Sequence, residues 1–120
     1  MELVLVLDCS DLDRVGDFWA EALGYRKVGY AEPYLVLAPA DGGSGPELVL
    51  QRVPEPKTVK NRMHLDIRTG EMETEVERLL ALGATRITIE PIEEQGMRWV
   101  VMADPDHNEF CVCERQAGDG

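Results

Sequence analysis

The chain has 120 residues and a formal net charge of −11 at pH 7, from 12 basic and 23 acidic side chains. This length predicts one domain, and the negative charge argues against nucleic acid and anionic membranes as partners. No apolar run approaches the ~18 residues of a membrane span, and the start of the chain lacks the features of a signal peptide. The three cysteines, Cys9, Cys111 and Cys113, cannot all pair within one chain. We therefore expect them to be small core residues of a protein in the reducing cytoplasm.

The first half of the chain predicts a strand, a helix and three further strands. Residues 3–9 alternate as a strand, and residues 10–13 (Ser-Asp-Leu-Asp) resemble a capping box that begins a helix. Gly24 is a natural end for that helix. Strands are then predicted at residues 25–30, 33–38 and 46–53.

The second half repeats this order after a proline-containing linker at residues 54–62. Residues 63–68 predict a strand, and the next helix has one apolar face, formed by Met72, Val76, Leu79, Leu80 and Gly83. Strands follow at 85–89, 97–103 and 109–114, and residues 116–120 predict a disordered tail. The chain thus reads as one domain, residues 1–115, with one module at 1–53 and a second at 63–115.

Two helices that end in Leu-Gly, at Leu23-Gly24 and Leu82-Gly83, lie about sixty residues apart and mark the duplication. The predicted class is α+β: two βαβββ modules form a curved mixed sheet around a cleft, with the helices on its outer face.

Strand alternation predicts which side chains face the cleft. Asp8 in the first strand and His64 and Asp66 in the fifth should face it, as should Cys111 and Cys113 in the last. The residues expected to face the helices are Leu3, Leu5, Leu7, Met63, Leu65, Ile67, Phe110 and Val112.

Four motifs in this order resemble the vicinal oxygen chelate superfamily over about residues 2–114. They are the Ser-Asp-Leu…Phe-Trp…Leu-Gly-Tyr helix, the doubled module, the His-Leu-Asp strand and the Asp-Pro-Asp-x-Asn-Glu-Phe turn. That superfamily includes glyoxalase I, extradiol dioxygenases, fosfomycin-resistance enzymes and bleomycin-resistance proteins, and the chain is most similar to its glyoxalase-like domain group. The resemblance implies a cleft for a small molecule and, if the protein is an enzyme, a glyoxalase-like lyase or dioxygenase-type activity.

The resemblance also implies four metal-ligand positions, one on an inner strand of each quarter of the cleft. These fall at Val4, at Leu50 or Gln51, at His64 and at Cys111. Valine has no donor atom and Gln51 is a weak ligand, whereas catalytic zinc uses three protein ligands and non-haem iron uses two histidines and a carboxylate. We therefore expect no cofactor and a metal-independent binder or enzyme; the alternative is a metal-dependent lyase or dioxygenase with an atypical ligand set.

Each candidate residue also has an ordinary structural interpretation. His64, the candidate catalytic residue, either contacts a ligand or is hydrogen-bonded to Asp66 or Gln51. Trp99 either stacks on a flat ligand or packs in the core. The candidate ligand contacts are His64, Gln51, Asp66, Trp99, Cys111 and Asp8.

Two further features of the sequence bear on what the protein binds. Lys57, Lys60 and Arg62 form a basic loop that either admits an anionic substrate or is a solvated linker. Open sheet edges and a small core predict a homodimer.

Overall fold

The computed structural model describes residues 2–116, which form two compact units that divide between Thr58 and Val59. Within the described residues there are two helices and nine strands, arranged as one mixed sheet with one helix in each unit. The predicted α+β class and the repeated βαβββ module are confirmed. None of the helices in this part of the chain is long and apolar enough to cross a membrane.

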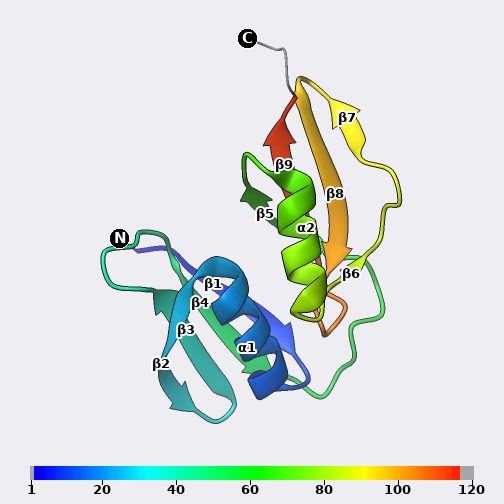
Figure 1. Cartoon of the computed structure of the whole chain (residues 1–120). Helices are drawn as coiled ribbons and strands as arrows, with labels where there is room; N and C mark the ends of the chain where they lie inside the picture. The colour runs from blue at the N-terminus through cyan, green and yellow to red at the C-terminus, as the bar shows by residue number, and fades with distance from the viewer. Residues whose placement is uncertain (1, 117–120) are drawn as a thin grey trace. The chain divides into compact units, whose positions relative to one another are not determined.

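The first unit contains one helix and a four-stranded sheet in the order β1-β4-β3-β2, in which β1 and β4 are parallel and the other pairs antiparallel. The elements are β1 (Val4–Cys9), α1 (Leu12–Leu23), β2 (Tyr25–Ala31), β3 (Tyr34–Pro39) and β4 (Glu47–Arg52). Helix α1 covers one face of this sheet (Figure 1).

Helix α1 is held by an apolar face and by caps at both ends. Val15, Phe18 and Trp19 are buried, as are Leu37 and Leu50 of the sheet. The N-cap is Asp11, whose Oδ1 accepts from the Arg14 N–H at 3.1 Å, so the cap predicted at Ser10 is wrong by one residue. Gly24 ends the helix in the left-handed region, at φ 69°, as predicted.

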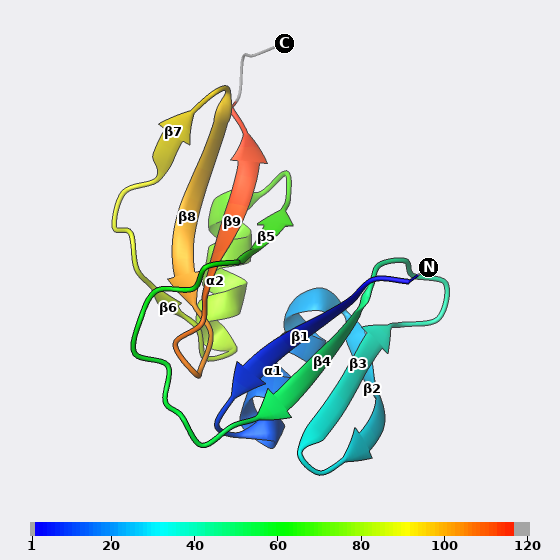
Figure 2. The same cartoon turned by 180° about the vertical axis from the view of Figure 1, so that it is seen from behind.

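The second unit contains a five-stranded sheet in the order β5-β9-β8-β6, with β7 also paired to β8. Its elements are β5 (Leu65–Arg68), α2 (Met72–Ala81), β6 (Thr85–Arg86), β7 (Ile92–Glu94), β8 (Met97–Ala103) and β9 (Glu109–Arg115). Only β5 and β9 are parallel. Helix α2 packs on one face, where Val76, Leu79, Val100, Phe110 and Val112 are fully buried. Figure 2 shows this sheet from its other, open face.

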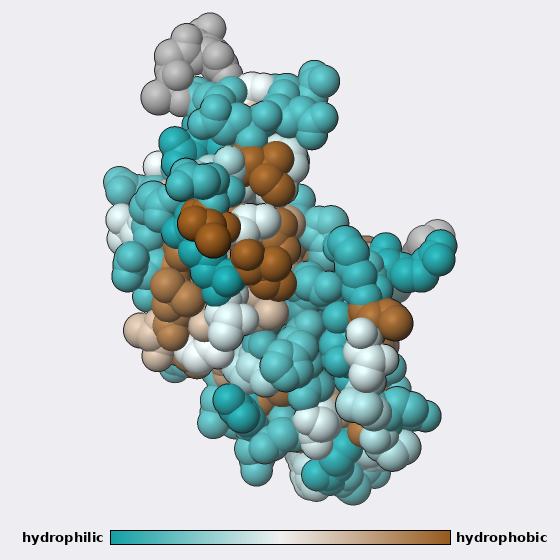
Figure 3. Space-filling view, turned by 90° about the vertical axis from the view of Figure 1, so that its right-hand side faces the viewer, coloured by the Kyte–Doolittle hydropathy of each residue, from teal (hydrophilic) through white to brown (hydrophobic). Residues whose placement is uncertain are grey.

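The strand predicted at 85–89 is shorter than expected. The Val101 N–H donates to the Thr88 hydroxyl at 2.9 Å, and the Ile87 and Thr88 N–H groups both donate to the Val101 carbonyl. The hydrogen bond to the Thr88 side chain replaces a backbone hydrogen bond of regular antiparallel pairing with β8, so β6 ends at Arg86. Ile87 and Ile89 are consequently exposed, and Figure 3 shows hydrophobic surface gathered on the second unit.

Strand β7 was not predicted from the sequence. It forms a hairpin with β8 through Gln95 and Gly96, at φ 55° and 74°. Two consecutive positive φ angles are typical of the type I′ turn, whose twist matches that of the flanking strands.

Three residues that were expected to be buried between a helix and its sheet are exposed. Leu3 and Met63 are 70% and 65% exposed because β1 and β5 begin only at Val4 and Leu65, so the alternation does not reach back to them. Leu80 is also exposed, at the edge of the buried face of α2. The predicted tail lies outside the described residues except for Gln116, whose N–H donates to the Gly96 carbonyl.

The turn between β8 and β9 is organised by one buried carboxylate. Asp104 Oδ1 accepts from the Asp106 and Asn108 N–H groups, at 2.8 and 2.9 Å, and its Oδ2 accepts from the Asn108 amide at 3.2 Å. His107 in this turn has φ 71°, in the left-handed region that favours glycine. These bonds fix where β9 begins, and therefore which of its side chains reach each face of the sheet.

Candidate ligand pocket

The open face of the second unit's sheet holds a pocket of about 440 Å³. Strands β5, β9 and β8 lie side by side there, and their register forms two rows of side chains across the sheet. Asp66, Cys111 and Val101 make one row; Arg68, Cys113 and Trp99 make the other. The pocket is therefore formed within a single unit.

The pocket is hollow because small side chains lie between large ones. Cys111 and Cys113 on the central strand β9 form its floor, each 7% exposed. The longer side chains of Arg68 on one side and Trp99 on the other rise from the neighbouring strands. A volume of this size is within the usual range for small-molecule sites.

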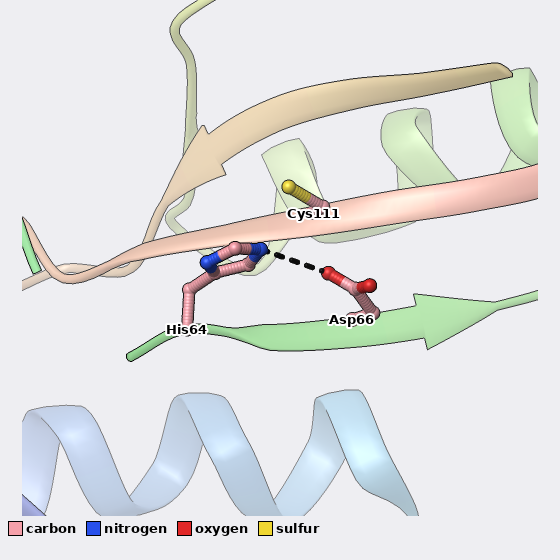
Figure 4. A group of neighbouring side chains, drawn as sticks. All are labelled: His64, Asp66 and Cys111. Carbon is pink, nitrogen blue, oxygen red and sulfur yellow. Dashed lines mark ion pairs between the residues drawn. The ribbon is translucent and has the colours of Figure 1, made fainter. Parts of the chain in front are cut away.

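His64 and Asp66 point toward one another on the β5 side of the pocket (Figure 4). His64 Nε2 lies 3.2 Å from Asp66 Oδ1, and both side chains are about half exposed. A carboxylate that holds one ring nitrogen fixes the orientation of the imidazole and leaves the other nitrogen for a ligand. This pairing was one of the two predicted for His64; the other candidate, Gln51, lies in the first unit.

Figure 4 also shows Cys111 on the neighbouring strand β9, and its Sγ lies within 4.8 Å of ligand atoms of His64 and Asp66. Burial, with the nearby charge of Asp66 and the Cys113 thiol as further causes, raises the pKa of Cys111 to about 11. The pKa of Cys113 is also raised, first by burial and then by Asp66. Both thiols are therefore neutral at physiological pH, which makes them an apolar floor rather than nucleophiles.

The predicted site residues divide between the two units. His64, Asp66, Trp99 and Cys111 line the one pocket. Asp8 and Gln51 lie in the first unit, where β1 and β4 place them opposite one another in register.

Several residues of the pocket were not singled out from the sequence. Arg68 has the same alternation as His64 and Asp66, which was a usable signal. Met97 and Val101 alternate with Trp99 in the strand predicted at 97–103, which was also a usable signal. Glu94 and Gln95 belong to β7 and its turn, which were not predicted. Lys60 was noted as part of the basic loop and lines this pocket.

A second pocket, of about 550 Å³, lies in the first unit and has paired charges. Its Arg52 is ion-paired with Glu32, and its Lys27 with Asp17 at 2.5 Å. The Tyr30 hydroxyl also donates to Glu32, at 2.6 Å. These partners occupy the groups that would otherwise meet a ligand.

A doubled βαβββ module with a pocket on an open sheet face is the architecture of the vicinal oxygen chelate superfamily. The chain belongs to the glyoxalase-like domain family, whose model matches residues 4–113. No sequence among the curated proteins matches the chain.

Solved structures show the same fold at low identity. A glyoxalase/bleomycin resistance protein/dioxygenase family enzyme from Burkholderia phytofirmans has a TM-score of 0.77 and 15% identity, with 94% of this chain and 97% of that one covered. The fosfomycin resistance protein FosX from Listeria monocytogenes, solved with Mn(II) and sulfate, has a TM-score of 0.77 and 15% identity over 98% and 91%. FosX from Mesorhizobium loti has a TM-score of 0.72 and 16% identity over 98% and 93%.

The side chains of this pocket fit manganese poorly. His64, Asp66 and Cys111 each offer one ligand atom, and these atoms lie within 4.8 Å of one another. Manganese prefers carboxylate, carbonyl and water oxygens, whereas one imidazole, one carboxylate and one thiol are a donor set suited to zinc. A thiol must lose its proton to ligate, and the raised pKa of Cys111 opposes that loss.

Proposed function

We propose that this protein binds a small, partly apolar organic molecule in the pocket of its second unit, without a resident metal. It acts as a binder of the bleomycin-resistance kind or as a metal-independent enzyme, in the cytoplasm and as a homodimer. The observation that carries the proposal is the composition of the pocket: a neutral floor at Cys111 and Cys113, an aromatic wall at Trp99, and one oriented polar pair, His64 and Asp66.

The polar pair supports a role in orienting the ligand. Asp66 fixes the ring of His64, so its second nitrogen has a defined position from which to donate to or accept from a bound molecule. In a metal-independent enzyme, the same nitrogen would move a proton, which makes His64 the candidate catalytic residue. Asp8 and Gln51 stay predicted contacts from the sequence.

The second candidate is a metal-dependent activity with an atypical ligand set, favoured by the proximity of His64, Asp66 and Cys111. These three residues would hold the ion, and a bound divalent metal would supply Lewis-acid polarisation of a ligand oxygen.

Protein purified without a histidine tag separates the two candidates. Elemental analysis should find no stoichiometric divalent metal, and a thermal-shift screen of small organic molecules should find compounds that raise the melting temperature. About one zinc, iron, nickel or manganese per chain would instead establish the metal-dependent candidate.

Substitution then tests the assigned contacts. A hydrogen bond contributes about 1 kcal/mol net, so His64→Ala should weaken binding severalfold. Gln51→Ala, which the sequence also predicts to weaken binding, lies outside this pocket and tests that expectation separately. His107→Asn is the matched control, because the only other histidine lies exposed in a turn away from the pocket. If His64→Ala sharply lowers the melting temperature while the protein that remains folded binds the ligand with unchanged affinity, then His64 is a structural residue.

A further inference from the structure

The pocket of the second unit contains two cations that have no ion-pair partner among residues 2–116. They are Lys60, from the segment before β5, and Arg68, at the end of β5. In a chain with a net charge of −11, carboxylates are plentiful, and the pocket of the first unit shows both of its corresponding cations paired. Lys60 and Arg68 therefore differ from the two cations of the first unit's pocket, whose charges are paired.

The carboxylates that line the same pocket already have other contacts or lie far from Arg68. Asp66 is held by His64, and Glu109 Oε1 accepts from the Asn61 N–H at 3.1 Å. Glu94 is exposed beside the β7–β8 turn, and β7 is three strand spacings from β5, roughly 14 Å. On the β5 side of the pocket, Lys60 and Arg68 are thus exposed cations that form no ion pair within residues 2–116.

On the opposite side of the pocket, strand β8 contributes apolar side chains, with Glu94 and Gln95 beyond them at the β7–β8 turn. Trp99, Met97 and Val101 on β8 provide an indole and two aliphatic side chains. In the row Arg68, Cys113, Trp99, the outer residues are two strand spacings apart, roughly 10 Å between Cα atoms. The small, neutral side chain of Cys113 lies between them and leaves room for a flat group.

We propose that the ligand of this pocket is an organic acid with a flat apolar body. Its carboxylate is received by the guanidinium of Arg68, and its ring lies over Cys113 against Trp99. Arginine is suited to this role because its planar fork binds a carboxylate through two parallel hydrogen bonds. The inference rests on the proposed function, since it names the chemical class that the same pocket accepts.

Nuclear magnetic resonance provides a direct test, because the chain has two tryptophans in different units. Trp19 is buried in the core of the first unit at 1% exposure, whereas Trp99 lines the pocket. The ¹⁵N-labelled protein is titrated with phenylacetate, with its neutral isostere phenylacetamide and with the cation 2-phenylethylamine, and a Trp99→Phe variant assigns the two indole signals. Phenylacetate should move the Trp99 signal and leave the Trp19 signal unchanged, and phenylacetamide should bind roughly ten- to a hundredfold more weakly.

Arg68→Gln and Arg62→Gln form a matched pair, because each removes one cation and Arg62 is exposed outside the pocket. Arg68→Gln should weaken phenylacetate binding roughly tenfold or more and leave phenylacetamide binding unchanged, whereas Arg62→Gln should change neither. Three results would each overturn the organic-acid inference: equal affinity for phenylacetate and phenylacetamide, tighter binding of 2-phenylethylamine, or no effect of Arg68→Gln. None of them would contradict the proposal that the pocket binds a small molecule. Failure of all three probes to move the Trp99 signal would overturn both.

Discussion

A buried thiol beside a carboxylate behaves differently from an exposed one, and Cys111 shows why. The charged thiolate would lose hydration and would lie close to the negative charge of Asp66, so both effects favour the protonated form. In pockets where cysteine acts as a nucleophile, a nearby base or cation has the opposite effect. Here the thiol contributes shape and apolar surface.

This protonation state can be measured by alkylation. The rate at which iodoacetamide modifies Cys111 should keep rising up to a pH of about 11, because only the thiolate reacts. Asp66→Asn removes the neighbouring charge, should lower the pKa of Cys111 and should speed its modification at pH 8. Glu77→Gln, an exposed carboxylate of helix α2 on the other side of the same sheet, is the control and should have no effect on Cys111. Site-resolved mass spectrometry gives both rates, and a rate that levels off near pH 8 would show that the thiol is not perturbed.

At this scale, strand alternation was enough to place His64, Asp66 and Cys111 on one face, because each strand buries its other face against a helix. Alternation does not say which long side chains find partners. The partner of His64, Asp66 or Gln51, depended on which strands become neighbours. Whether Arg68 forms an ion pair depends on the positions of all the carboxylates around it. These outcomes are set by tertiary packing rather than by local pattern.

Helix α2 begins in an unusual way for its sequence. Its N-cap residue, Glu71, makes no side-chain cap, and the Met72 N–H donates instead to Glu114 Oε1 of β9, at 2.8 Å. The other oxygen of Glu114 lies 3.5 Å from Nε of Arg98. One carboxylate from a distant strand therefore caps the helix and forms an ion pair with the partly buried Arg98.

Replacing this residue should destabilise the protein. Glu114→Ala leaves the Met72 N–H without its acceptor and Arg98 without this partner, so we expect a loss of about 1–3 kcal/mol in the free energy of unfolding. Glu77→Ala, an exposed acidic residue of the same helix, removes the same charge and should cost much less. Denaturant midpoints of the two variants provide the comparison, and equal midpoints would mean that the Glu114 contacts contribute nothing.

Helices and long strands were predictable from their periodicity, whereas short strands were not. The turn that creates β7 is only two residues long, and its Gln-Gly pair is a weaker signal than Asn-Gly. The early end of β6 depends on the Thr88 hydroxyl, which competes with the backbone for the Val101 N–H. Both exceptions arise where one side chain or one turn outweighs the alternation of a few residues.

At the scale of the whole molecule, the first unit carries apolar surface of the kind that a second copy would cover. In the first unit, Val6, Val49 and Val36 lie in register across β1, β4 and β3, on the face opposite α1. Val6 is 53% exposed, and neighbouring Tyr34 is 42% exposed. Exposed apolar stripes and open sheet edges are usually covered in solution.

We therefore expect a homodimer, with a mass by light scattering of twice the 13.4 kDa of one chain. Val6→Asp introduces a charge into the stripe and should shift the mass toward that of the monomer. Ile89→Asp, an 84% exposed position in the second unit, serves as the control and should leave the mass unchanged. A mass near 13.4 kDa for the unchanged protein at every concentration would exclude the dimer.

The doubled plan itself was visible in the sequence because each module buries its own helix face and ends its helix with Leu-Gly. Two such signals, about sixty residues apart, are enough to predict the class and the order of elements. They carry no information about whether the pocket uses one module or both, since that depends on the sizes of the side chains on each open face.

The order of strands has a consequence for the timing of synthesis. In each unit, the last strand along the chain lies in the interior of the sheet: β4 lies between β1 and β3, and β9 lies between β5 and β8. A nascent chain that stops short of residues 109–115 therefore contains α2, β5 and β8, but it lacks the strand that pairs with both β5 and β8. The second unit is completed only when β9 emerges, and the same strand delivers the cysteines of the pocket floor. Until then its partners present unpaired strand edges, the surfaces by which incomplete chains associate with one another.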